Sequence, residues 1–423
     1  MSVGGKGIPR LQDLSYIEVA VSRVAAGAAF EGIRRALVDR AAQIDRVNDL
    51  DGSFDEQRWE RARADKKKYV HNTVDVLKEL MRLGWIERAV LPSGPDSAYA
   101  HASTTYSLTP AGRRWADLAA TNQRDAYNAL VGDLINAHPQ FEGFLRLIGG
   151  RPESTNTHFT VPTLRDATGR YTSNEAYLDD FIGRAIDAAS AKTLGWNASG
   201  EEVEQGIRSY VERIQARAAA RQKVVTQRQF VNTCEEAISR VAFTAAGCPM
   251  DYITLELLRR WTRFLGLATF SYYAPGPGAL RLWATATVTG RGPDTAIKRR
   301  VGYDVRHEAL KELWGVWQTE RSEGSGMYLP IWQLRAAVCW KQRINDDEFD
   351  VAITEALAGK HGDLGINIHL DQATLRATPS STGPLVIPTA SGLRRVFNVI
   401  NLTHRPTESN RPTAVAPALG RNS

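Results

Sequence analysis

The segment VHNTVDVLKELMRLGWIERAVLP (Val70–Pro92), followed further along the chain by TTYSLTPAG (Thr104–Gly112), decides the fold. Apolar residues recur at three- to four-residue spacing through the first part of this segment, which predicts an amphipathic helix. Gly84 stands where a glycine commonly ends a helix. Trp85–Leu91 and Thr104–Leu108 predict two strands, joined by a tip that is rich in proline and glycine. The sequence therefore predicts a helix followed by a β-hairpin.

The string L-x-x-L-x-R-L-G-W-I-x-R, which begins at Leu77, and the later Y-S-L-T-P-A-G resemble the recognition helix and wing of MarR- and PadR-type winged-helix proteins. The resemblance covers about residues 14–120. It implies a mainly α-helical winged helix-turn-helix fold, in which the third helix enters the major groove of DNA and the wing lies beside it.

A second copy of this pattern lies in the C-terminal half of the chain. The paired strands predicted there are Leu267–Tyr273 and Ala279–Val288, and Leu265–Ala268 matches Leu83–Ile86. Residues 159–167 (FTVPTLRDA) likewise match residues 327–337 (MYLPIWQLRAA), and each match precedes a helix with a possible capping box, Thr172 with Glu175 and Asn345 with Glu348. We therefore expect an internal duplication, A–B–A′–B′. The alternative is chance alignment of helical segments.

The expected modules have these ranges: winged-helix module A at 11–120, module B at 125–203, a basic helix with winged-helix module A′ at 204–292, a helical linker with module B′ at 295–402, and a disordered tail at 403–423, rich in Pro, Ser and Asn.

The composition fits a cytoplasmic protein, and its mild positive charge fits either a nucleic-acid partner or an ordinary solvated surface. The chain has 423 residues, with 53 Lys+Arg against 47 Asp+Glu, a net charge of +6 and a pI near 9.2. No apolar run is long enough to span a bilayer, and the start MSVGGKGIPR lacks the apolar core of a secretory signal. Cys234, Cys248 and Cys339 are scattered, which argues against a disulfide framework and a structural zinc site.

Positive charge in module A is concentrated where a winged helix contacts DNA. Lys66, Lys67 and Lys68 precede the predicted third helix, whose N-terminus itself attracts phosphate. Asn72 can pair with adenine through two hydrogen bonds, and Arg88 lies on the wing. The alternative is that the lysines form a solvated turn.

Three further basic groups are candidate DNA contacts. In module A′, arginines lie on the third helix and the wing, although pairing with Glu256 is the alternative for those on the helix. Residues Glu204–Arg228 predict one helix with a stripe of arginines, which could follow a duplex backbone or be a solvated linker. A third group precedes the helix that leads into B′. These candidates are Arg259, Arg260, Arg263 and Arg281; Arg213, Arg217 and Arg221; and Lys298, Arg299 and Arg300.

Modules B and B′ differ from A and A′ in charge. Their candidate third helices carry several carboxylates, which phosphates would repel. We expect these modules to pack on each other, including in a homodimer, or on a partner protein. The helices concerned carry Glu175, Asp179, Asp180 and Asp187 in B, and Asp346, Asp347, Glu348 and Asp350 in B′.

Motifs of catalysis are not evident. The chain has no Walker-type phosphate loop, and Pro275–Gly278 is a turn between strands rather than a phosphate cradle. His369 and Asp371 alternate on a predicted strand and share a face, for which a structural role is favoured. The cysteines have apolar neighbours, typical of buried thiols, and most tryptophans lie at core spacing. We therefore expect no enzyme, no cofactor and no metal site.

These features predict a non-catalytic protein of tandem winged helices that binds double-stranded DNA as a subunit of a prokaryotic multi-protein complex, for example in defence or chromosome maintenance. Two alternatives remain. One is a sequence-specific transcription or replication regulator, which would be a symmetric dimer on a palindrome. The other is a scaffold in a defence or condensin-like machine that binds partner proteins without touching DNA.

Overall fold

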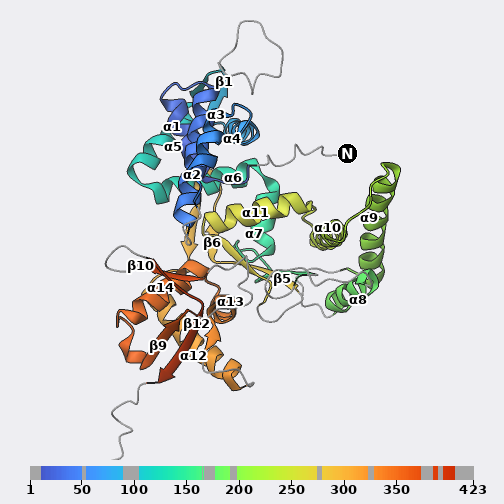
Figure 1. Ribbon diagram of the computed structural model, residues 1–423, viewed down its shortest axis with the longest axis vertical. Helices are drawn as coiled ribbons and strands as arrows, with labels where there is room; N and C mark the ends of the chain where they lie inside the picture. Colours follow the sequence, from blue (N-terminus) through green and yellow to red (C-terminus); the bar gives the residue numbers. More distant parts are fainter. Residues whose placement is uncertain are drawn as a thin grey trace, which may run out of the picture. The chain divides into compact units, whose positions relative to one another are not determined.

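The computed structural model describes residues 11–49, 54–88, 104–163, 165, 177–190, 198–273, 279–322, 328–372, 384–388 and 394–404. It is mainly helical, with small antiparallel sheets (Figure 1). The chain forms two compact units, residues 1–272 with 276–300 and residues 273–275 with 301–423. The observed boundary after Arg300 lies close to the expected start of module B′. The division into four modules stays a prediction. Among the described helices, none is long and apolar enough to cross a bilayer.

The first lobe of unit 1 is a cluster of helices with one hairpin. Its first two helices are separated at Gly27, which adopts a φ of +72° and ends the first of them. The lobe comprises α1 (Ser15–Ala25), α2 (Phe30–Asn48), α3 (Glu56–Ala64), α4 (Val70–Arg82), β1 (Ile86–Arg88), β2 (Tyr106–Leu108) and α5 (Pro110–Thr121). β1 and β2 pair antiparallel, with Ile86 opposite Leu108, which confirms the predicted hairpin.

The second lobe of unit 1 surrounds a three-stranded antiparallel sheet in the order β3-β5-β4. Its central strand pairs with β3 on one side and β4 on the other, which confirms the predicted pairing of the second hairpin. The strand predicted over Ala279–Val288 is divided, because the central strand ends at Ala284 and a separate strand begins at Ala286. β3 lies within expected module B, and the expected modules B and A′ thus share one sheet. The elements are α6 (Gln123–Ala137), α7 (Pro139–Leu147), β3 (Phe159–Pro162), α8 (Tyr177–Ser190), α9 (Gly200–Ala220), α10 (Gln227–Ala245), α11 (Tyr252–Phe264), β4 (Ala268–Ser271) and β5 (Ala279–Ala284).

A third hairpin, which was not predicted, closes unit 1. It consists of β6 (Ala286–Thr289) and β7 (Ala296–Arg299), joined through the short 3-10 helix η2 (Gly292–Asp294). Gly132 on α6 lies so close to Gly292 that a Cβ there would clash with its carbonyl oxygen. The hairpin therefore depends on a glycine in the middle of another helix.

Unit 2 repeats the alternation of helices with a three-stranded sheet, in the order β8-β12-β9. Asn345 caps α14 by accepting a hydrogen bond from the backbone N–H of Glu348, as expected of half a capping box, whereas Thr172 and Glu175 lie outside the described residues. The elements are α12 (Tyr303–Ser322), β8 (Leu329–Pro330), α13 (Ile331–Gln342), α14 (Asp346–Leu357), η3 (Gly362–Leu364), β9 (Ile366–Asp371), β10 (Leu385–Pro388), β11 (Arg394–Phe397) and β12 (Val399–His404).

The two helix–hairpin joints of unit 1 are built by the same hydrogen bonds. At the first, Gly84 has a φ of +70°, and Thr109 donates its N–H to the carbonyl of Trp85 and its hydroxyl to that of Gly84. At the second, Gly266 has a φ of +64°, and Thr285 donates its N–H to Leu267 and its hydroxyl to Gly266. The match between Leu83–Ile86 and Leu265–Ala268 thus extends to the backbone conformation.

Tryptophans fill the core of unit 1, as expected. Trp85 is 1% exposed and stacks on Trp115 with ring centres 4.7 Å apart. Trp261 is fully buried and donates its indole N–H to the carbonyl of Leu11. These aromatic side chains stabilise the packing of α4, α5 and α11, because the indole N–H of each also forms a hydrogen bond.

Candidate nucleic-acid interface

The three lysines of the first lobe lie in the turn between α3 and α4, and all three are exposed. Lys67 donates its backbone N–H to the side chain of Asp65, which keeps the turn compact. Within the residues that the structure describes, no carboxylate forms an ion pair with any of the three ammonium groups. The turn therefore presents its charge to solvent.

Arg34 anchors this turn from below, and sequence reasoning missed it. Its side chain is completely buried and binds both carboxylate oxygens of Glu31 at 2.8 Å. The same guanidinium donates to the carbonyls of Lys68, Asp65 and Arg63 at 3.1–3.2 Å. The hydrogen bond from Arg34, together with its charge, lowers the pKa of Glu31. Because the buried Arg34 side chain binds the backbone carbonyls on the inner side of the turn, the lysine side chains point outward.

The other candidates of the first lobe are less exposed. Asn72 is half-buried on the first turn of α4, one residue after the exposed His71. Arg88 is half-buried at the end of β1, opposite Tyr106. The hairpin tip, at 89–103, lies outside the described residues.

Arg259 on α11 is not a surface residue, which corrects the sequence prediction. Its side chain is 6% exposed and pairs with Glu256 one turn earlier, the alternative that the sequence had left open. Its guanidinium carbon lies 3.8 Å from the centre of the Phe270 ring. Arg259 and Arg263 do not share the solvent face, because Arg259 turns toward β4.

The remaining arginines of this lobe differ in their exposure. Arg260 and Arg263 are exposed, and Arg260 donates to the side-chain oxygen of Gln12 at 3.0 Å. Arg281 lies on the central strand β5, half-buried, where burial lowers its pKa to about 10. Of the residues predicted from this helix and strand, Arg260 and Arg263 are thus the ones that face solvent.

Exposure alternates along the segment Lys298–Arg300, as it does when successive side chains of a strand point to opposite faces. Lys298 and Arg300 are exposed, whereas Arg299 is half-buried between them. Arg299 donates to the side chain of Asn128 at 2.9 Å and to the carbonyl of Leu265 at 3.1 Å. Burial and the charge of Arg124 lower its pKa. Arg299 therefore joins β7 to the end of α11, and its guanidinium is engaged by partners within the chain.

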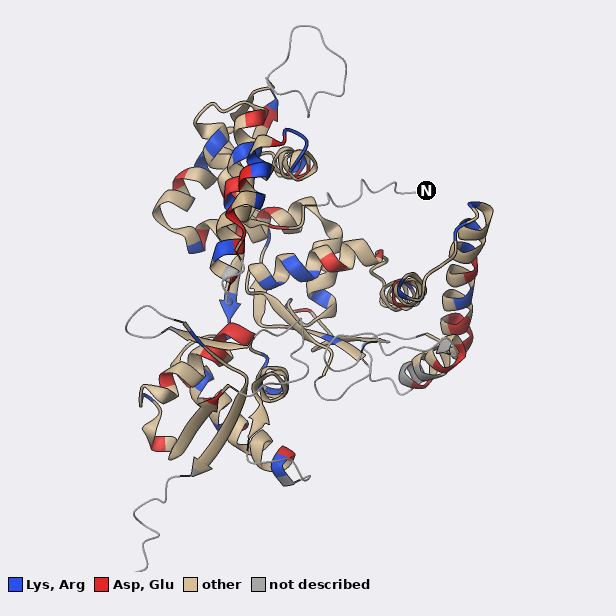
Figure 2. Ribbon diagram, in the orientation of Figure 1, with Lys and Arg blue, Asp and Glu red and all other residues tan. Residues whose placement is uncertain are grey.

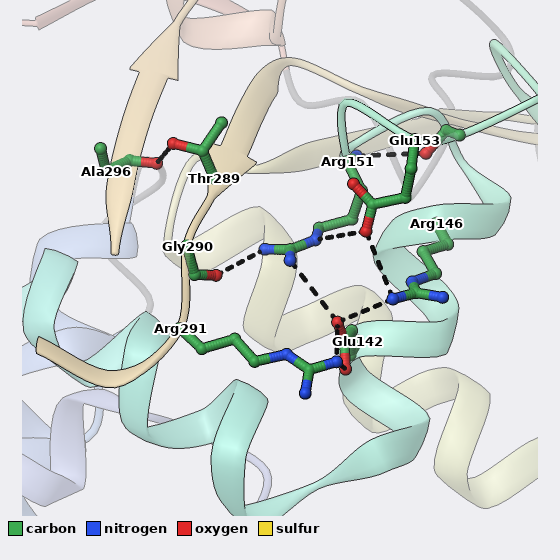
Figure 3. A network of polar contacts seen from close by, with 9 residues as sticks. Glu142, Arg146, Arg151, Glu153, Thr289, Gly290, Arg291 and Ala296 are labelled. Atoms are coloured by element: carbon green, nitrogen blue, oxygen red, sulfur yellow. Dashed lines mark hydrogen bonds and ion pairs between the residues drawn. The ribbon is translucent and has the colours of Figure 1, made fainter. Parts of the chain in front are cut away.

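A network of charges surrounds Gly290 and Arg291, in the turn between β6 and β7 (Figure 3). Glu142 on α7 accepts hydrogen bonds from Arg291 at 2.7 Å, and ion-pairs with Arg146 and Arg151 at 3.2 and 3.5 Å. Arg151, 7% exposed, donates to the carbonyl of Gly290. Burial raises the pKa of Glu142, but Arg291 and the other two arginines outweigh it and lower the pKa below its usual range.

The predicted helix over Glu204–Arg228 is two helices. α9 ends at Ala220, and α10 begins at Gln227 behind a capping box made by Thr226 and Gln229. The stripe is confirmed as exposed at Arg213, Arg217 and Arg221, but Arg228 belongs to α10. Figure 2 shows acidic residues toward the α8 end of α9 and basic residues toward the other end.

The acidic helices use several of their carboxylates internally. On α8, Asp179 binds Arg208 at 2.6 Å. On α14, Glu348 pairs with Arg306 at 2.7 Å, and Asp350 accepts two hydrogen bonds from the buried Arg335. Glu175 lies outside the described residues. These carboxylates therefore stabilise helix packing within the chain.

The candidates for catalysis have structural surroundings. His369 and Asp371 lie on the exposed face of β9, as predicted, and His369 contacts the hydroxyl of Thr403 at 3.3 Å. Burial and the charge of Glu235 raise the pKa of the Cys234 thiol to about 12, and burial raises that of Cys248 to about 11, so both stay protonated at neutral pH. Among the described residues no cluster of three or more His, Cys, Asp or Glu side chains forms a metal site.

Comparison with protein-family models, with curated proteins and with solved structures finds no match.

Proposed function

We propose that the chain is a non-catalytic, double-stranded DNA-binding protein built of winged-helix lobes, and that it serves as the DNA-binding subunit of a multi-protein prokaryotic complex. The observation that carries this proposal is the exposed, unpaired turn at Lys66–Lys68, which leads directly into α4 and the β1–β2 hairpin.

The order of elements supports winged helices. In such a fold a helix and a short strand precede two helices and a hairpin, and the last strand pairs with both others. The second lobe follows this order through α7, β3, α10, α11, β4 and β5, with α8 and α9 inserted. Unit 2 follows it through α12, β8, α13, α14, β9 and β12. On this proposal α4, α11 and α14 are the third helices of three lobes.

Electrostatics support a DNA contact in unit 1. The three adjacent ammonium groups have no carboxylate partner among the described residues, so they lose little by meeting phosphate, and they release the counterions condensed on the duplex. Arg260, Arg263, Lys298 and Arg300 are further exposed cations of the same unit. The third helix of unit 2, α14, begins with Asp346 and Asp347, and this charge opposes a phosphate backbone.

Replacing Lys66, Lys67 and Lys68 together by Ala tests the proposal. We expect the Kd for a mixed-sequence duplex to rise at least about tenfold, and the slope of log Kobs against log salt to fall by about 0.9 for each phosphate that the variant no longer neutralises. A matched control replaces Lys311, Lys341 and Lys360, each of which pairs with a glutamate at 2.7–3.0 Å. The control removes the same charge but is expected to keep its affinity.

Equal weakening by both triple variants would show a general charge effect and reject the assignment to this turn. Tight binding to one palindrome by a symmetric dimer would favour the regulator, because sequence readout then exceeds the backbone contribution. No binding at low salt, together with a stable protein partner, would favour the scaffold.

A further inference from the structure

An open cavity of about 580 Å³ lies between α9 and α10 in unit 1. Its walls include Glu202, Arg213 and Arg240, with Thr244 at the rim. Volumes of roughly 300–1,000 Å³ are typical of sites that enclose small organic ligands. The cavity is therefore too large for an inorganic ion alone and suits a nucleotide-sized molecule.

Gly206 explains why the two helices approach closely beside this space. A Cβ at Gly206 would clash with Cγ2 of Val241 on α10, so the backbone of α9 packs directly against the Val241 side chain there. The neighbouring wall residues Ala198 and Ala245 are small and leave the space unfilled. The cavity thus combines a rigid helix contact with an apolar wall.

Two arginines concentrate positive charge at one end of the cavity. The guanidinium carbons of Arg213 and Arg240 lie 4.8 and 5.0 Å from the centre of the Tyr210 ring. Arg240 approaches Glu236 only to 3.6 Å, and its side chain is 42% exposed. Within the described chain Arg213 forms no ion pair with a carboxylate. Donors therefore remain for an incoming anion.

The carboxylate in the cavity wall does not cancel this charge. Glu202 accepts a hydrogen bond from the backbone N–H of Ser199 at 2.8 Å, in the capping box of α9. Its charge is therefore taken up by the helix N-terminus. Glu202 lies about three turns of α9 away from Arg213, so the cavity is polarised along its length.

We propose that this cavity binds an organic phosphate of nucleotide size, with its phosphate group at Arg213 and Arg240 and its organic part along Ala198, Val241 and Ala245. This is a site for a small molecule, distinct from the proposed duplex contacts. It removes Arg213 from the stripe that would follow DNA and leaves Arg217 and Arg221 for that role.

Isothermal titration calorimetry with AMP, adenosine and inorganic phosphate tests the proposal on the full chain. AMP is expected to bind. Adenosine and inorganic phosphate are each expected to bind at least about tenfold more weakly, because each makes only part of the contacts that AMP makes. Arg213→Ala is expected to weaken AMP binding about tenfold or more through loss of a charged hydrogen-bond donor. Arg221→Ala, at the C-cap of α9 and outside the cavity, is the matched control and should leave AMP binding unchanged.

Thr244→Trp fills the cavity and keeps both arginines, so it should abolish AMP binding. Thr244 is exposed, and the fold is checked by circular dichroism. Duplex affinity of Arg213→Ala should equal that of the wild type, so failure here is distinguishable from failure of DNA binding. The proposal is overturned if AMP shows no heat at about 1 mM, or if Arg213→Ala and Thr244→Trp bind AMP like the wild type.

Discussion

Adjacent arginines on α11 have opposite environments. Arg259 is buried against Phe270 and pairs with Glu256, whereas Arg260 is exposed. A buried guanidinium has no water around it and depends on its partners in the protein. Removing it leaves the partner carboxylate unpaired and creates a cavity. An exposed guanidinium contributes little to stability and is available to a ligand.

Arg259→Ala is therefore expected to lower the free energy of unfolding by about 3 kcal/mol, and Arg260→Ala by less than about 0.5 kcal/mol. Urea denaturation of the two variants measures both values. Arg260→Ala should instead weaken duplex binding. A similar stability loss in both variants would contradict the burial of Arg259.

Glu142 gives unit 1 a defined response to acid. Its pKa in the folded protein lies below the ordinary value of 4.5, so it contributes stability above that pH, and the contribution is lost as the pH falls through the folded-state pKa. We expect Glu142→Gln to be less stable than the wild type near neutral pH and the difference to shrink in acid. Thermal unfolding over a pH series measures this, with Glu212→Gln, an exposed change on α9, as the control. A difference that stays constant with pH would contradict the role of the ionised carboxylate.

At the scale of elements, each helix–hairpin joint of unit 1 depends on one glycine and one threonine. The glycines accept a left-handed conformation that other residues resist, and the threonine hydroxyls bind the glycine carbonyls that end the helices. Thr109 has an additional role, because its hydroxyl also accepts the N–H of Gly112 and caps α5. Thr285 lacks this second role, since β6 rather than a helix follows it.

This difference predicts unequal effects of one substitution. Thr285→Val should cost about 1 kcal/mol through loss of a hydrogen bond, and Thr109→Val about 2 kcal/mol through loss of the same bond and the helix cap. Chemical denaturation of both variants compares them directly. Equal losses would show that the cap of α5 adds nothing to stability.

At the scale of the whole molecule, the chain divides into two units that each have a core. Units with separate cores commonly unfold in separate transitions. Arg335 is a probe of unit 2, because it is 2% exposed and donates two hydrogen bonds to Asp350 within that unit.

Calorimetry of the full chain is expected to show two transitions, and Arg335→Ala should lower the temperature of one while leaving the other unchanged. The Arg259→Ala variant should affect the other transition. A single transition that both variants shift together would show that the units unfold as one.

The extent of prediction from sequence differs among these scales. Apolar periodicity and the glycines at 84 and 266 were sufficient to predict both hairpins and the helices before them, because these features are encoded within a few neighbouring residues. The helix predicted over Glu204–Arg228 extended past the end of α9 at Ala220, because the capping pair Thr226 and Gln229 at the start of α10 was overlooked. The exposure of charged residues was predicted less accurately than the fold. Arg259 and Arg299 fitted the sequence pattern of a DNA contact as well as their exposed neighbours did.

Local spacing and turn chemistry act along the chain, and they were sufficient to predict most helices, the two hairpins that follow α4 and α11, and the position of a lysine turn ahead of α4. Only the tertiary structure decided which cations reach solvent, because that depends on partners distant in sequence, such as the carbonyl of Lys68 for Arg34 and Asn128 for Arg299. The structure also showed the cavity between α9 and α10 and the pairing of β3 with β5. Packing brings these segments together, and the sequence pattern of either segment alone does not reveal its partner.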